Sequence, residues 1–96
     1  MSLTPKQRRY LRSLAHHRKP VAMVGTTGLT SAVIKEIDQC LARHELIKIK
    51  INKALRSERK EITDEVCTHT GCQWIQDIGR MAIIYRAKKN PDITLP

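Results

Sequence analysis

The sequence predicts a single compact α/β domain in which helices pack on an open four-stranded mixed sheet. Three observations lead to this prediction: helical periodicity of apolar residues in three segments, strict alternation in a fourth segment, and a hairpin signal near the C-terminus. The chain has 96 residues, a length that suits one domain. We therefore treat residues 1–96 as one domain, with the order helix, strand, helix, strand, helix, strand, strand.

The first helix is expected within LTPKQRRYLRSLAHH, residues 3–17. Thr4 can cap this helix, Pro5 suits its first position, and Gln7 completes a capping box. Apolar residues of the segment fall on one helical face, and its arginines lie largely off that face. These arginines are Arg8, Arg9 and Arg12.

A strand and a second helix come next. PVAMV, residues 20–24, is a short apolar run and predicts a buried strand. TSAVIKEIDQCLARH, residues 30–44, predicts a helix with Thr30 as its N-cap.

The clearest periodicity in the chain lies in LIKIKIN, residues 46–52. Apolar and polar residues alternate strictly there, which predicts a half-buried strand. The isoleucines point toward the core, and Lys48 and Lys50 point away from it. The exposed face of this strand is therefore expected to be basic.

The C-terminal half also contains a helix before the predicted hairpin and a tail after it. SERKEITDEVCTHTG, residues 57–71, predicts a third helix, with Ser57 as its N-cap and Gly71 at its end. Residues 88–96 contain two prolines and little pattern, so we expect a flexible tail there.

The hairpin is formed by CQWIQDI and MAIIYRA. Gly79 and Arg80 separate these strands, and glycine at the first loop position fits a two-residue type II′ turn. In this register Trp74 lies opposite Tyr85. We expect the pair to pack in the core, and stacking of exposed bases on these rings is the alternative.

Charge is the strongest signal in the composition. Eighteen Lys and Arg residues against nine Asp and Glu give a net charge of +9. The bases are clustered, because residues 1–28 hold six bases and no acid, and residues 48–60 hold six bases and one acid. Such clustering favours a basic face that attracts a polyanion: nucleic acid, anionic lipid or an acidic protein.

The segment GTTG, residues 25–28, joins the first strand to the second helix. Its glycines allow positive φ angles and close approach of another chain. Thr26 and Thr27 add hydroxyl donors, and the unpaired N–H groups of a helix start follow, which together suit a phosphate. An ordinary strand-to-helix turn is the alternative. The loop lacks the third glycine of a dinucleotide-binding loop and the Lys-Ser or Lys-Thr of a P-loop.

The surroundings of this loop favour nucleic acid. A GxxG loop between a strand and a helix in a small basic domain is how KH-like modules clamp a nucleic-acid backbone. The chain has no Phe, one Trp and two Tyr, so it cannot build the aromatic sheet surface on which RRM-like modules stack bases. Binding is therefore expected to depend on phosphate contacts and shape.

Several segments resemble the CRM domain, which is named for chloroplast RNA splicing and ribosome maturation. They are LTPKQRRYLRSLAHHRKPVAMVGTTGLT, ELIKIKI, the strand from Gly71 to Ile78, and IGRMAIIYR. The match covers nearly the whole chain and looks most like the single-domain bacterial YhbY-like RNA-binding proteins. The resemblance implies a fold similar to the C-terminal domain of a bacterial translation initiation factor. It also implies association with ribosomal RNA in precursors of the large ribosomal subunit and a role in their assembly.

The resemblance places the family's conserved loop at Gly25, Thr26, Thr27 and Gly28. The two middle positions often carry a basic or amide side chain in relatives, so with two threonines the affinity depends more on backbone donors and on lysines elsewhere. The cations expected around the loop are Arg18, Lys19, Lys48, Lys50, Arg80 and Arg86. Arg8, Arg9 and Arg12 are expected to form an outer patch.

Other classes of function find less support. CTHTGC offers Cys67, His69 and Cys72, but this spacing matches no common zinc pattern, so we expect neither a metal nor another cofactor. The absence of a nucleophile elbow or paired-carboxylate spacing argues against an enzyme, and we expect no small-molecule substrate. No apolar run is long enough to span a membrane, and the first helix offers few bulky anchors for a membrane surface.

The main alternative is a non-enzymatic adaptor that binds an acidic protein partner through the same basic face. Nuclease treatment separates the two hypotheses, because it removes RNA-mediated association and spares direct protein contact. The three cysteines have no framework spacing and no signal peptide is visible, so a cytoplasmic protein is expected. We also expect a monomer.

Overall fold

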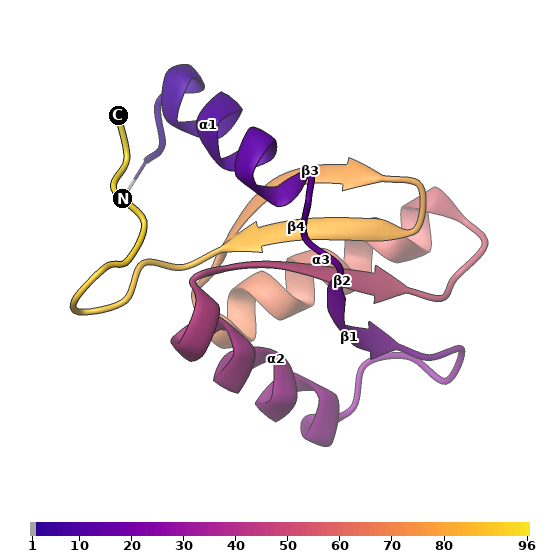
Figure 1. Ribbon diagram of the computed structural model, residues 1–96. Coiled ribbons are helices and arrows are strands. Elements are labelled where there is room, and N and C mark those ends of the chain that lie inside the picture. The colour runs from indigo at the N-terminus through magenta and orange to yellow at the C-terminus, as the bar shows by residue number, and fades with distance from the viewer. Residues whose placement is uncertain (1) are drawn as a thin grey trace.

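The computed structural model describes residues 2–96, and its elements follow the predicted order (Figure 1). The helices of this part of the chain are α1 (Pro5–Ala15), α2 (Ser31–His44) and α3 (Arg56–Thr70). The strands are β1 (Pro20–Val24), β2 (Leu46–Ile51), β3 (Gln73–Ile78) and β4 (Met81–Tyr85). None of these helices is both long enough and apolar enough to cross a lipid bilayer.

The strands form one mixed sheet in the order β1-β2-β4-β3, which confirms the predicted α/β architecture. β1 runs parallel to β2, whereas β4 is antiparallel to both β2 and β3. α2 makes the crossover between the two parallel strands. β1 is an edge strand with Val21 and Met23 exposed, so the prediction of a buried strand holds only for Ala22 and Val24.

Helices lie on both faces of the sheet and create two apolar clusters (Figure 1). On one face, α2 and α3 pack against Ile47, Ile49 and Ile51 of β2. On the other face, α1 packs near the beginning of β2. The buried residues there, which we call the α1 cluster, are Leu11, Ala15, Leu46, Ile75, Ile83 and Tyr85. The predicted alternation of β2 is therefore confirmed. α1 covers only that end of its face, and the rest of the face is open.

Several local signals act as expected. Thr4 and Gln7 form the capping box of α1, Thr30 caps α2, and Gly71 ends α3 in the left-handed conformation. The N-cap of α3 is different, because the helix begins at Arg56 and Ser57 lies inside its first turn.

The earlier start of α3 has a visible cause in the connection from β2. The Arg59 guanidinium donates to the carbonyl oxygens of Lys53 and Ala54, each at 2.8 Å. These bonds hold the connection against the first turn of α3, so the helix begins before the residue that could have capped it. Leu55 is the N-cap and makes no side-chain capping bond.

The turn of the hairpin is the predicted one. Ile78 pairs with Met81, so Gly79 and Arg80 alone form the loop. Gly79 has a φ of +57°, which places it in the region that favours glycine.

The register beyond this turn differs from the prediction. A β-bulge between Trp74 and Gln76 inserts one residue, so Trp74 pairs with Ile84 instead of Tyr85. A shift of one residue moves a side chain to the other face of a sheet. The expected core pair is therefore wrong: Tyr85 is buried in the α1 cluster, and Trp74 is 43% exposed on the opposite face.

Residues 88–96 form no helix or strand but are attached to the domain. The buried carboxylate of Glu45 accepts hydrogen bonds from the backbone amides of Lys88, Asp92 and Ile93, at 3.3, 2.7 and 3.1 Å. Apolar side chains of the same segment pack against the α1 cluster. The flexibility of this tail stays a prediction. Its contacts come from a distant buried acid that the tail's own pattern does not reveal.

Candidate nucleic-acid interface

The GTTG loop is a tight turn at the end of β1. The amide of Gly28 donates to the carbonyl oxygen of Gly25 at 3.0 Å, and the amide of Asn52 donates to the carbonyl oxygen of Val24 at 2.8 Å. The loop is thus closed on itself and tied to the end of the neighbouring strand.

The two glycines of the loop differ in their backbone conformation. Gly28 has a φ of +94°, which an L side chain rarely adopts. Gly25 has no such φ, and a Cβ atom at that position would meet nothing within 4 Å. No contact with the rest of residues 2–96 therefore requires glycine at residue 25, and the space beside it is open to a ligand.

The donors at the tip of the loop are Thr26 and Thr27, both exposed. Within residues 2–96, neither of their amides takes part in a hydrogen bond. The start of α2 is less available, because the Thr30 hydroxyl already accepts the amide of Val33 at 3.2 Å. The loop therefore offers more free backbone donors to an anion than the helix terminus does.

Two other segments meet the loop at the same edge of the sheet. Lys53 Nζ donates to the carbonyl oxygen of Thr26 at 2.5 Å. Arg80 Nη1 donates to Asn52 Oδ1 at 2.8 Å. This arrangement follows from topology, because the parallel strands β1 and β2 end at one edge and the β3–β4 turn lies beside the end of β2. We call residues 25–28 together with Asn52, Lys53 and Arg80 the loop edge.

Lys53 contacts the loop, although the sequence analysis did not select it. Its signal was present in the basic run of residues 48–60. The residue follows the last strand position and lies outside the alternating pattern, so only its contact with Thr26 assigns it to the loop.

Lys48 and Lys50 extend the basic surface from the loop edge onto the open face of the sheet. Both are partly exposed and lie on the face that α1 leaves uncovered. Their positions on β2 are two residues apart, about 7 Å. In register Lys50 adjoins Met23 of β1 and Met81 of β4, and Lys48 adjoins Pro20 and Ile83.

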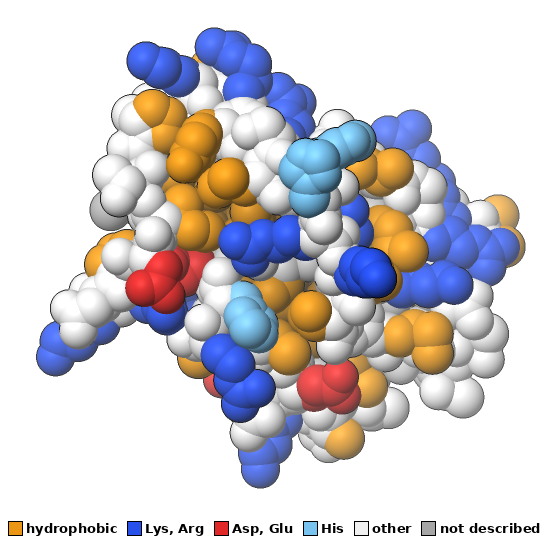
Figure 2. Space-filling view, viewed as in Figure 1, with side chains coloured by type: hydrophobic (Ala, Val, Ile, Leu, Met, Phe, Trp, Pro, Cys, Tyr) orange, Lys and Arg blue, Asp and Glu red, His pale blue; other side chains and the backbone are white. Residues whose placement is uncertain are grey.

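Acids do not neutralise this surface. The ion pairs among residues 2–96 are Arg86–Asp38 and Lys88–Asp92, and neither lies at the loop edge. Figure 2 shows blue Lys and Arg side chains, with no red side chain beside them, at the end where β1 and β2 finish. The loop edge is therefore a region of positive potential on this face.

Arg86 lies away from the predicted site. It follows β4 at the end of the sheet opposite the loop edge. Its Nη1 contacts Asp38 Oδ1 at 2.6 Å and the carbonyl oxygen of Thr70 at 2.7 Å. This guanidinium connects α2 to the end of α3, and its charge is compensated.

Arg18 and Lys19 precede β1 and so lie a strand's length from the loop, about 17 Å for five residues. Arg18 Nη1 donates to the carbonyl oxygen of Leu46 at 2.5 Å, which orders the start of β2. Lys19 is exposed and adjoins Pro20, which pairs with Lys48. Lys19 therefore extends the basic surface formed by Lys48 and Lys50, whereas Arg18 makes a hydrogen bond within the fold.

The arginines of α1 also divide by role. Arg8 Nη1 donates to the carbonyl oxygen of Trp74 at 2.8 Å, which joins α1 to β3. Arg9 and Arg12 are exposed, and no ion pair within residues 2–96 involves them.

The cysteines and histidine of CTHTGC do not form a group of three metal ligands. Among residues 2–96, no group of three His, Cys, Asp or Glu side chains is arranged to hold a metal ion. Cys67 Sγ and Cys72 Sγ lie 3.4 Å apart. The hydrogen bond between them lowers the pKa of Cys72 to about 7 against the effect of burial, and it raises the pKa of Cys67.

Comparisons with known proteins establish the family of the chain. Residues 3–86 match the model of the CRS1 / YhbY (CRM) domain. The chain belongs to the CRM domain family. This CRM domain is 40% identical to a probable RNA-binding protein of Pseudomonas aeruginosa, over 99% of this chain and 91% of that protein. It is 39% identical to an RNA-binding protein of Haemophilus influenzae, over 99% and 96% of the two chains.

A solved structure also resembles this CRM domain along its whole length. It is the solution structure of a Staphylococcus aureus protein named as a candidate RNA-binding protein. The TM-score is 0.86 at 41% identity, and the match covers 99% of this chain and all of the other. The fold is therefore shared with a free-standing domain of the same size.

Proposed function

We propose that this CRM domain binds structured RNA through the loop edge and the adjoining lysines, and that its target is ribosomal RNA in precursors of the large subunit. The observation that carries the proposal is an exposed glycine-bounded loop set among cations that form no ion pair with any acid of residues 2–96. The names of the relatives support RNA as the ligand. The ribosomal target rests on the family resemblance.

Each part of the loop edge has a chemical role in this proposal. The amides and hydroxyls of Thr26 and Thr27 donate hydrogen bonds to phosphate oxygens, and the bare Gly25 lets the ribose–phosphate backbone come close. Lys50 and Arg80 supply positive charge on either side. Contacts of this kind position a backbone and read little sequence, so shape selects the target.

The proposed role is binding and not catalysis. No chemical step, cofactor or small-molecule substrate is needed for a domain that recognises a folded RNA. We further propose that it acts as a monomer in the cytoplasm.

Replacing Lys48 and Lys50 with Glu tests the electrostatic part. Affinity for a labelled ribosomal RNA fragment should fall by about tenfold or more, since two attractive charges become repulsive. Fluorescence anisotropy measures the affinity, and circular dichroism checks the fold. The double variant Arg43→Glu/Lys89→Glu is the matched control, because it makes the same change in net charge at exposed positions away from the loop edge. Equal losses in both variants would contradict a localised site.

Sedimentation of cell extracts tests the target. The protein should travel with large-subunit precursors and leave these fractions after nuclease treatment. Retention after complete RNA digestion would favour the adaptor that binds an acidic protein. Sequencing of RNA cross-linked to the protein then identifies the contacted region.

A further inference from the structure

Trp74 occupies an unusual position for the chain's only tryptophan. The bulge in β3 turns it away from the α1 cluster to the opposite face, at the outer edge of the sheet. Its side chain is 43% exposed there, although a large aromatic side chain gains much from burial. The fold thus presents an indole ring to solvent.

The ring is held in a defined orientation. Its Nε1 donates a hydrogen bond to Asp77 Oδ1 at 2.9 Å. The guanidinium carbon of Arg8 lies 5.7 Å from the ring centroid, within the range of a cation–π contact. Because these contacts already order the ring, a ligand would lose little conformational entropy by stacking on it.

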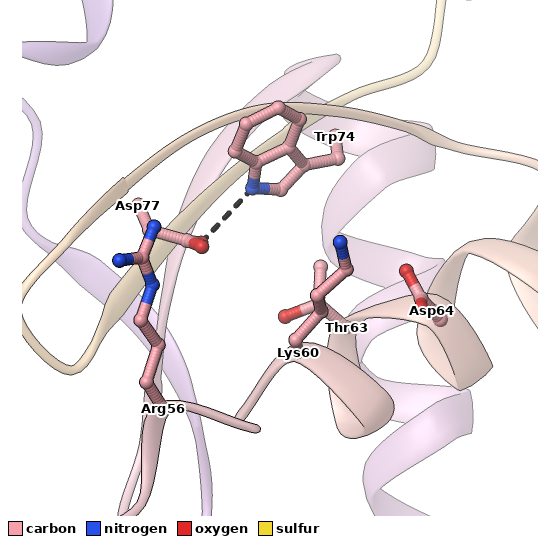
Figure 3. Close-up of a pocket in the computed structure, with 6 residues that line it drawn as sticks. All are labelled: Arg56, Lys60, Thr63, Asp64, Trp74 and Asp77. Atoms are coloured by element: carbon pink, nitrogen blue, oxygen red, sulfur yellow. Dashed lines mark hydrogen bonds between the residues drawn. The ribbon is translucent and has the colours of Figure 1, made fainter. Parts of the chain in front are cut away.

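A hollow of about 190 Å³ lies beside the indole, between β3 and the first half of α3. Figure 3 shows Arg56 and Lys60 extending from α3 toward the strand that carries Trp74 and Asp77. Both cations are exposed, and neither takes part in an ion pair within residues 2–96. The volume is below the roughly 300–1,000 Å³ of a typical small-molecule site, which suits one unit of a longer ligand.

The acids of the hollow are placed to meet a base edge. Asp77 is engaged with the indole N–H, and Asp64 lies farther along α3. Carboxylates accept hydrogen bonds from exocyclic amino groups of bases and repel phosphate. A nucleotide would therefore place its phosphate toward Arg56 and Lys60 and its base toward Trp74 and the acids.

The hollow adjoins the proposed RNA surface. A second depression next to it is lined by Arg56, Arg59, Asp77 and Gly79, and Gly79 belongs to the hairpin turn. The next residue of that turn, Arg80, is part of the loop edge. One RNA molecule could extend around the turn from the loop edge to the hollow.

We propose that this hollow is a second RNA contact, which takes a single unpaired nucleotide with its base stacked on Trp74 and its phosphate held by Arg56 and Lys60. The inference rests on the proposed function and adds to it a place where a base, and not only backbone, is contacted. Base–aromatic stacking of this kind accepts any base, with a preference for those that carry an exocyclic amino group.

The single tryptophan allows a direct test, because its fluorescence reports on this hollow alone. Titration with a single-stranded hexa-adenylate should quench the emission in a saturable way. An abasic oligomer with the same number of phosphates should leave the emission nearly unchanged. Equal responses to the two oligomers would show that no base stacks there and would overturn the proposal.

A variant pair separates this site from the loop edge. Trp74→Leu should weaken binding of labelled hexa-adenylate by roughly 5- to 150-fold in anisotropy, and Trp74→Tyr should retain most of the affinity. If Trp74→Leu binds hexa-adenylate normally while Lys48→Glu/Lys50→Glu loses the ribosomal fragment, the hollow is excluded and the proposed function stands. If the unaltered protein binds neither RNA, both proposals fail.

Discussion

Gly25 and Gly28 bound one loop but differ in what they do for the fold. Gly28→Ala places a Cβ atom at a φ of +94°, so we expect a loss of stability of about 1 kcal/mol. Gly25→Ala should change stability by less than about 0.5 kcal/mol, because the added atom meets nothing within 4 Å.

The order of the same two variants in RNA affinity should differ from their order in stability. Gly25→Ala should weaken binding of the ribosomal fragment while its urea unfolding curve stays the same. Anisotropy and urea denaturation on both variants provide the measurements. A Gly25→Ala protein with full affinity would remove close backbone approach from the proposed function.

The pKa of the Cys72 thiol depends on the neighbouring thiol of Cys67. The hydrogen bond with Cys67 lowers the pKa of Cys72 to about 7, so thiolate absorbance near 240 nm should rise with a midpoint near pH 7. Cys67→Ala removes that bond, and the midpoint should move up toward the ordinary value of 9.0. Cys40→Ala is the control and should leave the midpoint unchanged. If the midpoint stays near pH 7 in Cys67→Ala, the hydrogen bond with Cys67 is not what lowers the pKa of Cys72.

At the scale of elements, a residue between α2 and β2 accepts hydrogen bonds from the backbone of the C-terminal segment. Glu45 is fully buried and has a φ of +64°, and its carboxylate receives three backbone amides. Glu45→Gln replaces one acceptor oxygen with a donor that faces the same amides. We expect a loss of about 1–3 kcal/mol in the free energy of unfolding.

Urea denaturation and hydrogen exchange check this expectation. The amides of Asp92 and Ile93 should lose protection first in Glu45→Gln. Glu65→Gln, at an exposed position of α3, should match the unaltered protein. Equal stability of all three proteins would show that the hydrogen bonds between Glu45 and the tail contribute nothing to the free energy of unfolding.

For the molecule as a whole, the proposed RNA binding depends on where the charges that make up the net +9 lie on the surface. If about five phosphates of single-stranded RNA are neutralised, log K should fall against log salt with a slope near −3.5. Affinity measured between low and moderate salt gives the slope. A flat dependence would rule out the electrostatic part of the proposal.

The sequence alone determined the order of the elements, the capping of α1 and α2, the two-residue hairpin turn and the alternation of β2. These features depend on residues close together along the chain, so propensity and periodicity reveal them. Only the tertiary structure decided the contacts between distant segments. The bulge that turns Trp74 outward, the attachment of the tail at Glu45, the pairing of Arg86 with Asp38, and the contact of Lys53 with the loop all depend on sheet order and register. A one-residue shift of strand register, or a chain crossover, does not alter the periodicity of the sequence. It nevertheless changes which charged and aromatic side chains reach the surface.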